Sequence, residues 1–309
     1  MLVNLFQAGS AARAAEKRLR ELSEENPLLG PLVCAGGPTA YLSPGLHLDH
    51  LHPENARDVE ALYRAGVTSW TLAVFGRSED EIIERATSAA DSRAAKTAGF
   101  AGLYLEGPYL AGREGRAAGA AQLHGLLDRL DAAVAAVVFA PEAVDPDEFA
   151  PALAARRVRG VLGYTASGYD ECLAAFEGGA EGLCLPFISM PPFHHRSPGP
   201  MGAAFASGAR VEVALGRGAL DARQARILAK SFPETARPVY HPGRHPGEVD
   251  GGFPRDFCSR AAQSCGMPAR DFVSAAAAIR DGCMVLFDDR LRPVAVAVEG
   301  RVWRGREGR

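Results

Sequence analysis

The sequence predicts an α/β protein, a (β/α)8 TIM barrel with a small C-terminal β appendage. The first observation behind this prediction is size: 309 residues, 47% of them hydrophobic, are enough for one large core. The second is the alternation of predicted strands and helices, because apolar runs are followed by Ala-, Glu- and Arg-containing helical segments along most of the chain. The third is that no Gly-x-Gly-x-x-Gly turn opens a helix, which disfavours the alternative, a doubly wound open sheet.

The predicted strands are short apolar runs, many of them rich in β-branched residues, as is typical of buried parallel strands. Helical segments follow most of them, and this order is the one that a parallel barrel requires. The eight predicted strands are Leu46–Leu51, Thr68–Phe75, Phe100–Leu105, Val134–Ala140, Gly160–Tyr164, Gly182–Phe187, Val211–Leu215 and Pro238–His241. The clearest helices are Asn55–Ala65, Ser78–Ala98, Gly168–Gly178 and Asp221–Lys230.

The two ends of the chain depart from this alternation. Residues 1–42 are predicted to form an N-terminal helix, Ser10–Asn26, and a Pro/Gly-rich connector, since a serine cap precedes Ala-rich turns. The barrel is assigned to residues 43–282. Residues 283–309 are predicted to form a β-hairpin, because alternating valines flank a turn near Arg292-Pro293.

Charge and cysteine content exclude several classes of protein. The formal net charge is −3, without the clustered basic excess that nucleic-acid or anionic-membrane partners favour. No apolar run reaches membrane-spanning length, and the N-terminus lacks the pattern of a signal peptide. Six scattered cysteines without a Cys-x-x-Cys are typical of buried thiols. We therefore expect a cytoplasmic protein whose partner is a small molecule.

A His-x-His pair lies at the end of the first predicted strand. Because side chains alternate along a strand, we expect His50 and His52 to share one face, with Leu51 on the other. Two imidazoles on one face can chelate a divalent metal ion, although hydrogen-bonded core histidines are the alternative. His241 ends the eighth strand, which closes a barrel beside the first, so it is expected to face this pair.

Glu106, at the end of the third predicted strand, is a candidate fourth metal ligand or general base; a turn-capping or salt-bridged acid is the alternative. His50, His52, His241 and Glu106 would suit one divalent ion, Zn, Fe or Mn. A site without metal stays open, with Tyr164, Glu106 and His241 as proton carriers.

Two further candidates lie on the loops that follow the strands. His194, His195 and Arg196 belong to a Pro-rich loop predicted to bind an anionic substrate, since arginine offers phosphate or carboxylate a planar fork. The alternative for this loop is a rigid turn whose arginine pairs with a nearby acid. Glu142, at the end of the fourth strand, is better explained as a structural residue.

Several of these stretches resemble one known family. They are Pro44–His52, Gly66–Ser69, Leu105–Leu110, Ala140–Glu142, Gly163–Ala166 and, most specifically, Met190–Ala204. Together they resemble the N-acetylglucosamine-6-phosphate deacetylase family of the amidohydrolase superfamily, over residues 43–242. The resemblance implies a barrel with a small β-sandwich, of which the C-terminal hairpin is a remnant. It also implies a divalent metal that activates water for attack on an N-acetyl carbonyl, with an aspartate on strand eight as proton shuttle.

The sequence departs from this family at several functional positions. The resemblance places Tyr164 and Leu185 where the family has two metal-binding histidines, and His241 where it has the catalytic aspartate. Leucine cannot bind a metal, and tyrosine binds one poorly while its phenol is protonated. Glu106 and the His-x-His pair are retained.

Two functions follow from this mixture of retained and replaced residues. One is a repurposed hydrolase of a small anionic or sugar-derived amide, with a rewired site of Glu106, His241 and Tyr164. The other is a catalytically inactive pseudoenzyme, a sugar-phosphate-binding or scaffold protein. The usual deacetylation is not expected. An Ala-rich helix in place of half the sandwich is compatible with a homodimer.

Overall fold

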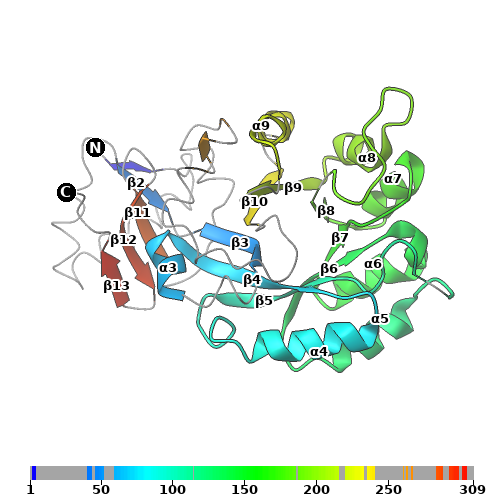
Figure 1. The fold of residues 1–309 in the computed structure, drawn as a ribbon, viewed down its shortest axis with the longest axis horizontal. Helices are drawn as coiled ribbons and strands as arrows, with labels where there is room; N and C mark the ends of the chain where they lie inside the picture. The colour runs from blue at the N-terminus through cyan, green and yellow to red at the C-terminus, as the bar shows by residue number, and fades with distance from the viewer. Residues whose placement is uncertain are drawn as a thin grey trace.

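The computed structural model describes residues 2–4, 40–43, 46–51, 59–113, 115–185, 187–215, 220–232, 235–240, 260, 262–263, 266, 283–287, 292–298 and 301–304. Within these ranges the chain forms two β-sheets, one of eight strands and one of five. Figure 1 shows the larger sheet curling through the body of the molecule, with the smaller sheet beside it at the left.

The larger sheet contains parallel strands arranged in chain order. It curls until its two edge strands, the first and the last, lie against one another. The predicted α/β architecture with eight parallel strands is confirmed, and each strand overlaps its predicted range, although β8 has only two of its six predicted residues. The strands are β3 (Leu46–Leu51), β4 (Val67–Phe75), β5 (Phe100–Glu106), β6 (Val134–Phe139), β7 (Arg159–Leu162), β8 (Gly182–Leu183), β9 (Arg210–Leu215) and β10 (Ala236–Tyr240).

Helices follow the strands and cover the outside of the curled sheet (Figure 1). Three of them begin at a side-chain cap, in which Ser78, Asp145 or Asp221 accepts a hydrogen bond from a backbone N–H of the first turn. Among the residues that the structure describes, no helix is both long and apolar enough to cross a bilayer. The helices are α3 (Val59–Arg64), α4 (Glu79–Ala90), α5 (Ala120–Asp128), α6 (Pro146–Ala155), α7 (Tyr169–Glu177), α8 (Gly199–Ser207) and α9 (Ala222–Ser231), with a short 3-10 helix, η1 (Pro141–Ala143).

The apolar core has two parts, one on each face of the larger sheet. The larger part packs between the sheet and the helices and contains Trp70 and Phe149. The smaller part lines the inside of the curl. Strand alternation separates the two, since Leu103 and Leu105 of β5 join the outer core while Tyr104 joins the inner one.

Alternation breaks within β3. The pairing with β4 sets Leu48 opposite Trp70 and Leu51 opposite Leu72, so a step of three residues on β3 faces a step of two on β4. His50 takes up the extra residue with a φ of 64°, in the left-handed region that few non-glycine residues adopt. The side of the sheet to which successive side chains of β3 point is therefore shifted by one residue after His50.

This bulge turns two successive polar side chains toward the inside of the curl. Asp49 and His50 both contact residues of other strands there, whereas Leu51 belongs to the outer core. Leu51 faces away from His50, as predicted. Simple alternation would also turn Asp49 away from His50, but the structure places both on the same side of the sheet. His52 lies outside the described residues.

Asp49 is the centre of a buried ion pair. Both of its oxygens accept hydrogen bonds from the Arg159 guanidinium, at 2.8 and 3.1 Å, and one also accepts from the Thr71 hydroxyl at 2.8 Å. His47 approaches the same carboxylate at 3.1 Å. Burial alone would raise the pKa of Asp49, but His47 and Arg159 outweigh burial and hold the pKa well below its usual range.

The smaller sheet combines strands from both ends of the chain. Its order is β1 (Leu2–Asn4), β2 (Ala40–Ser43), β11 (Cys283–Phe287), β12 (Pro293–Val298) and β13 (Arg301–Arg304). The antiparallel pair β11 and β12 corresponds to the hairpin that the sequence predicts. The segment predicted to hold only a helix and a connector also contributes β1 and β2, and its predicted helix lies outside the described residues.

The two sheets meet at Gly66, in the turn between α3 and β4. Gly66 has a φ of +85°, and a Cβ atom there would lie 2.7 Å from Cζ of Phe287 and 3.2 Å from Cγ1 of Val285. A glycine is needed here for two reasons, its left-handed backbone and the close approach of β11.

Gly66→Ala is therefore expected to lower the free energy of unfolding by about 2–4 kcal/mol, the sum of left-handed strain and overpacking. Gly112 provides a matched control, because its φ is +76° and nothing lies within 4 Å of its added Cβ. Gly112→Ala is expected to cost only the strain, about 1–2 kcal/mol. Urea unfolding of both variants tests the junction, and equal losses would contradict it.

Asp49→Ala is expected to lower the free energy of unfolding by about 3 kcal/mol, because it leaves the Arg159 guanidinium without its carboxylate. The exposed ion pair of Glu60 and Arg64 on α3 serves as control, and Glu60→Ala is expected to change stability by about 0.5 kcal/mol or less. Urea titrations of the two variants should differ accordingly. Similar midpoints would show that the Asp49 pair contributes no more than a surface pair.

Candidate functional site

The imidazole of His50 is fully buried, and each of its nitrogens faces a carboxylate. Nδ1 lies 3.0 Å from Oε1 of Glu106, at the end of β5, and Nε2 lies 3.0 Å from Oε2 of Glu212, within β9. Burial alone would lower the pKa of His50, but the carboxylates of Glu212 and Glu106 raise it well above its ordinary value. When both ring nitrogens carry a proton, each donates a hydrogen bond to the carboxylate that it faces.

Two phenols complete the partners of these carboxylates. The Tyr104 hydroxyl donates to Oε1 of Glu212 at 2.6 Å, and the Tyr164 hydroxyl donates to Oε2 of Glu106 at 2.5 Å. Burial, together with the nearby carboxylates, raises the pKa of both phenols, so both stay neutral donors. Each carboxylate thus joins the imidazole to one tyrosine.

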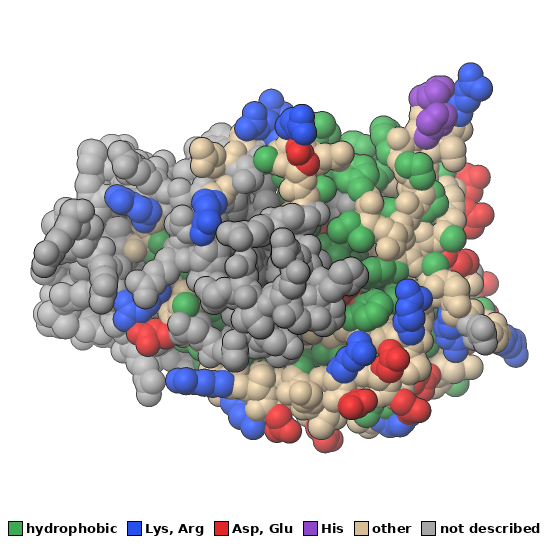
Figure 2. Space-filling model, in the orientation of Figure 1, with side chains coloured by type: hydrophobic (Ala, Val, Ile, Leu, Met, Phe, Trp, Pro, Cys, Tyr) green, Lys and Arg blue, Asp and Glu red, His purple; other side chains and the backbone are tan. Residues whose placement is uncertain are grey.

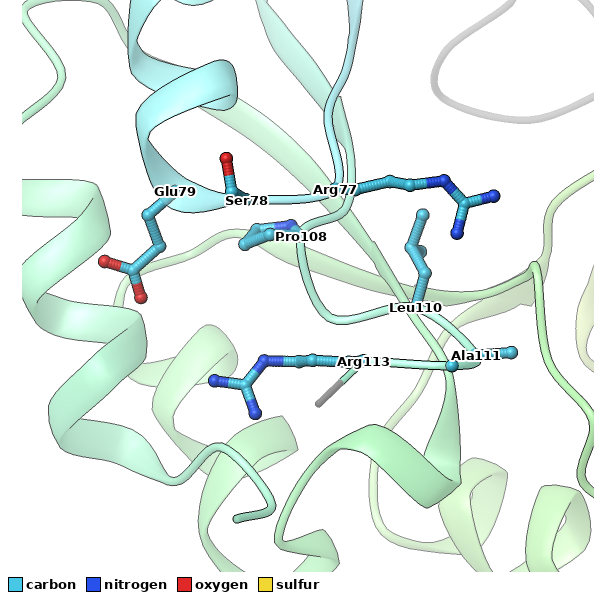
Figure 3. Close-up of a pocket in the computed structure, with 8 residues that line it drawn as sticks. Arg77, Ser78, Glu79, Pro108, Leu110, Ala111 and Arg113 are labelled. Carbon is cyan, nitrogen blue, oxygen red and sulfur yellow. The ribbon is translucent and has the colours of Figure 1, made fainter. Parts of the chain in front are cut away.

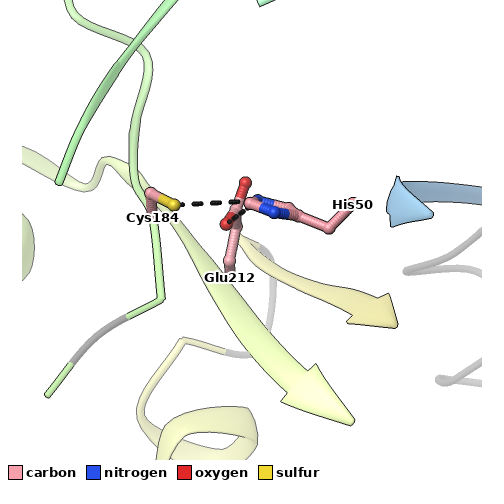
Figure 4. A group of neighbouring side chains, drawn as sticks. All are labelled: His50, Cys184 and Glu212. Atoms are coloured by element: carbon pink, nitrogen blue, oxygen red, sulfur yellow. Dashed lines mark hydrogen bonds and ion pairs between the residues drawn. The ribbon is translucent and has the colours of Figure 1, made fainter. Parts of the chain in front are cut away.

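Cys184 adds a thiol to the Nε2 side of His50. Its Sγ lies 3.6 Å from Nε2, and burial raises the pKa of the thiol well above its usual value. Cys184, His50 and Glu212 each offer one ligand atom, and these three atoms lie within 4.8 Å of one another. Figure 4 shows the side chains of Cys184 and Glu212 converging on the imidazole. A nitrogen, a sulfur and an oxygen form a donor set that divalent zinc accepts.

Left-handed backbone surrounds this group. His50, Tyr164 and Leu185, at the ends of β3, β7 and β8, have φ values of 64°, 48° and 40°. The Leu185 N–H donates to Oε2 of Glu212 at 3.3 Å, so this unusual backbone contacts the site directly. Such conformations cost free energy and persist where the surrounding structure enforces them, as it often does at functional sites.

The structure brings together three of the residues singled out from the sequence. His50, Glu106 and Tyr164 form one hydrogen-bonded chain at the carboxyl ends of their strands. His52 and His241 lie outside the described residues. The predicted metal set of three histidines and Glu106 therefore stays a prediction.

The predicted substrate loop lies apart from the buried group. His194, His195 and Arg196 are exposed at the tip of a tight turn closed by backbone hydrogen bonds between His194 and Ser197. Figure 2 shows histidine side chains beside a basic one at a protruding corner near α8. Within the described residues, Arg196 donates its backbone N–H to Nδ1 of His194, and the rings of His194 and His195 contact one another, so these contacts lie within the loop. Their substrate-binding role stays a prediction.

Glu142 connects two loops, in agreement with the structural role expected for it. Its carboxylate accepts hydrogen bonds from the Thr165 and Ser167 hydroxyls and from the Ala166 N–H, each at 2.6 Å. Burial raises the pKa of Glu142, but these hydrogen bonds outweigh burial and lower the pKa below its ordinary value.

A groove of about 510 Å³ lies beside the carboxyl ends of β4 and β5. In Figure 3 the side chains of Arg77 and Arg113 run along its walls in opposite directions. Guanidinium groups favour anions, whereas Glu79 opposes them. The residues lining the groove are Arg77, Ser78, Glu79, Pro108, Leu110, Ala111, Gly112 and Arg113.

Sequence reasoning missed Glu212, Cys184 and Tyr104. The available signal for Glu212 was a single acid between Val211 and Val213, since a charge within a buried strand needs a partner. The sequence predicts Cys184 only as one of several buried thiols, and the structure places it as a buried free cysteine. Nothing local distinguishes Tyr104 from a core tyrosine.

Several known proteins with similar sequences or folds are deacetylases of hexosamine phosphates. No protein-family model matches the chain. An N-acetylgalactosamine-6-phosphate deacetylase of Shewanella sp. (strain ANA-3) is 28% identical over 172 residues, which is 53% of this chain and 43% of that protein. An N-acetylglucosamine-6-phosphate deacetylase of Rattus norvegicus is 36% identical over 117 residues, 34% of this chain and 28% of that protein. The matches span less than half the length of these curated relatives.

Solved structures extend the similarity over most of the fold. An N-acetylglucosamine-6-phosphate deacetylase of Thermotoga maritima gives a TM-score of 0.66 at 20% identity, covering 86% of this chain and 89% of that chain. The Mycobacterium smegmatis enzyme gives 0.64 at 24% identity, covering 85% and 86%. These relatives point, at a distance, to the N-acetylglucosamine-6-phosphate deacetylase family, as the sequence motifs predict.

The hydrogen bonds to Glu142 predict a pH-dependent contribution to stability. Folding lowers its pKa below the ordinary value of 4.5, so the carboxylate contributes fully above that pH and loses its contribution as pH falls through the folded pKa. Glu142→Gln is expected to cost at most about 1 kcal/mol at pH 7, discounted for partial solvent screening. The gap between wild type and variant in urea unfolding should narrow below pH 4.5. A gap that widens there would contradict this role.

Proposed function

We propose that this protein is a hydrolase of the amidohydrolase type, acting on a small, anionic, sugar-derived amide. The reaction centre would be the buried group around His50 and Glu106, at the carboxyl ends of the strands. In this proposal the curled sheet is a TIM barrel, in which that end of the strands is where active sites lie.

One observation carries the proposal, the array in which Glu106 and Glu212 flank the buried imidazole of His50. Removing ionised groups from water costs several kcal/mol for each ion, and apolar residues would fill the same space at lower cost. A structural role therefore explains the array poorly. Clusters of buried titratable groups with strongly shifted pKa values are typical of catalytic centres.

Glu106 is the residue best placed for proton transfer. One of its oxygens contacts His50 and the other contacts Tyr164, so both neighbours fix its orientation. Tyr164 is only partly buried and forms the solvent-facing end of this chain. We assign Glu106 as the general base for an attacking water, with Tyr164 and the predicted His241 as further proton carriers.

The substrate class follows from the relatives and from the basic side chains near the strand ends. The relatives are named as deacetylases of N-acetylated hexosamine 6-phosphates, and a mutant of the Mycobacterium smegmatis enzyme is described in complex with N-acetyl-D-glucosamine-6-phosphate. His194, His195 and Arg196 would supply positive charge for such an anion on the predicted loop. The groove with Arg77 and Arg113 is a second basic region.

Glu106→Gln tests the proposal, because it keeps the shape of the side chain and removes its capacity to accept a proton. The purified protein is incubated with N-acetylglucosamine 6-phosphate, N-acetylgalactosamine 6-phosphate and related amides, and the released amine is measured. With the substrate that is turned over, the variant is expected to lose about 10²–10⁴-fold in kcat/KM.

Glu142→Gln is the matched control, a carboxylate at the next strand end with only structural contacts. It is expected to keep kcat/KM near the wild-type value. Full activity of Glu106→Gln, or equal losses in the two variants, would contradict the assignment of Glu106.

A second function, a sugar-phosphate-binding protein without turnover, is favoured by a specific observation. At the two positions where the resemblance expects metal-binding histidines, Tyr164 donates to Glu106 and Leu185 offers only its backbone N–H. This alternative predicts that hexosamine 6-phosphates raise the Tm through binding to the native state while no amine is released. Amine release that depends on Glu106 would exclude it.

A cytoplasmic location and a homodimer remain predictions from the sequence.

A further inference from the structure

We infer that His50, Cys184 and Glu212 bind one divalent metal ion of the zinc class inside the curl of the larger sheet. This inference deepens the proposed hydrolase by naming a ligand set. It rests on that proposed function only for the chemistry that the ion would serve.

The spacing of the donor atoms fits a single ion. Ligands at zinc bond lengths of about 2.0–2.3 Å in a tetrahedron lie about 3.4–3.6 Å from one another. Nε2 of His50 lies 3.6 Å from Sγ of Cys184 and 3.0 Å from Oε2 of Glu212. All three atoms fall within 4.8 Å of one another. The two distances from Nε2 of His50 are thus within a few tenths of an ångström of the tetrahedral spacing, and the Cys184 thiol and the Glu212 carboxylate would close on the ion around the fixed ring.

The contacts behind these donors have the pattern of an outer coordination shell. Metal-binding histidines usually donate their other ring N–H to a carboxylate, which fixes the ring and its tautomer. Glu106 accepts from Nδ1 of His50 and leaves Nε2 facing Cys184 and Glu212. Likewise Tyr104 holds the second oxygen of Glu212 and leaves Oε2 on the ligand side. Glu106 and Tyr104 thus orient His50 and Glu212 toward the ligand side without being ligands themselves.

The donor set also discriminates among metals. Thiolate and imidazole ligands favour zinc over magnesium, calcium or manganese, which prefer oxygen ligands. A metal ligand must be deprotonated at the coordinating atom, so binding of the ion would release the thiol proton of Cys184 and any proton on Nε2 of His50. When bound, such an ion supplies Lewis-acid polarisation of a carbonyl oxygen.

This set differs from the ligands that the family resemblance implies. That resemblance makes Glu106 a direct ligand and expects histidines where Tyr164 and Leu185 stand. Here Glu106 is not a ligand: it accepts from Nδ1 of His50 and remains the general base of the proposed reaction, while the thiol of Cys184 and the carboxylate of Glu212 take the place of the missing histidines. The inferred site therefore uses a different ligand set from the one that the family resemblance implies, and it does not depend on the ligands that this chain lacks.

Cobalt substitution tests the ligand set independently of activity. The full-length protein, freed of metal with a chelator, is loaded with Co²⁺ and examined by elemental analysis and absorption spectroscopy. We expect about one ion per chain, with the thiolate-to-cobalt charge-transfer band that a cysteine ligand produces. Cys184→Ser should abolish this band, and both Cys184→Ser and Glu212→Gln should weaken the Kd by more than about 100-fold, beyond the range of outer-shell changes.

Two further variants separate ligands from their neighbours. Cys172→Ser removes another buried free thiol, on α7, and should retain both the band and the affinity. Glu106→Gln should weaken the Kd by about 10–100-fold and yet retain the band, as expected for an outer-shell carboxylate.

The wild-type protein itself gives the deciding result if a variant fails to fold. Anomalous diffraction from zinc-loaded crystals should place the ion in contact with His50, Cys184 and Glu212. An ion elsewhere, no stoichiometric binding, or a band that persists in Cys184→Ser would overturn the inference. Hydrolysis without metal at these residues would overturn the ligand set alone, whereas metal binding without hydrolysis would overturn the proposed function alone.

Discussion

The buried imidazole of His50 can carry a positive charge because carboxylates from two distant strands lie against its two nitrogens. These carboxylates can in turn be buried because the imidazole and two phenols form hydrogen bonds with them. Glu106 and Glu212 each accept from His50 and from one tyrosine. Removing any member would leave a buried charge or polar group without its partner, which costs more than an ordinary hydrogen bond contributes. The interior of the curled sheet is organised around this mutual dependence.

The fold is similar to that of deacetylase structures over most of the chain, while the residues at two ligand positions expected from the resemblance are a phenol and a leucine. Tyr164 is a hydrogen-bond donor to Glu106, and the backbone of Leu185 donates to Glu212. In our proposal the chemistry at these strand ends rests on different side chains around His50. A fold of this kind tolerates such exchange because the strands fix the positions and leave the residue types free.

Local sequence patterns are enough to predict the strands of the larger sheet, their order and the end at which Glu106 and Tyr164 lie. These features follow from local patterns, since a run such as Val134–Phe139 contains the apolar residues that a buried parallel strand requires. They also predict a structural role for Glu142, which its hydrogen bonds support, and a buried thiol at Cys184, because each prediction needs only composition and a position in an element. The motifs of the loops further indicated the family to which the relatives point.

Which of these side chains meet depends on how the whole chain folds. Glu212 lies 162 residues after His50, and no local pattern reports a contact across that separation. The bulge that turns Asp49 and His50 to the same side is a property of the pairing between β3 and β4, which the sequence of β3 does not contain. The same holds for β1, whose three residues become a strand only by pairing with β2. Periodicity is local, whereas register, closure and the partners of buried charges depend on the whole chain.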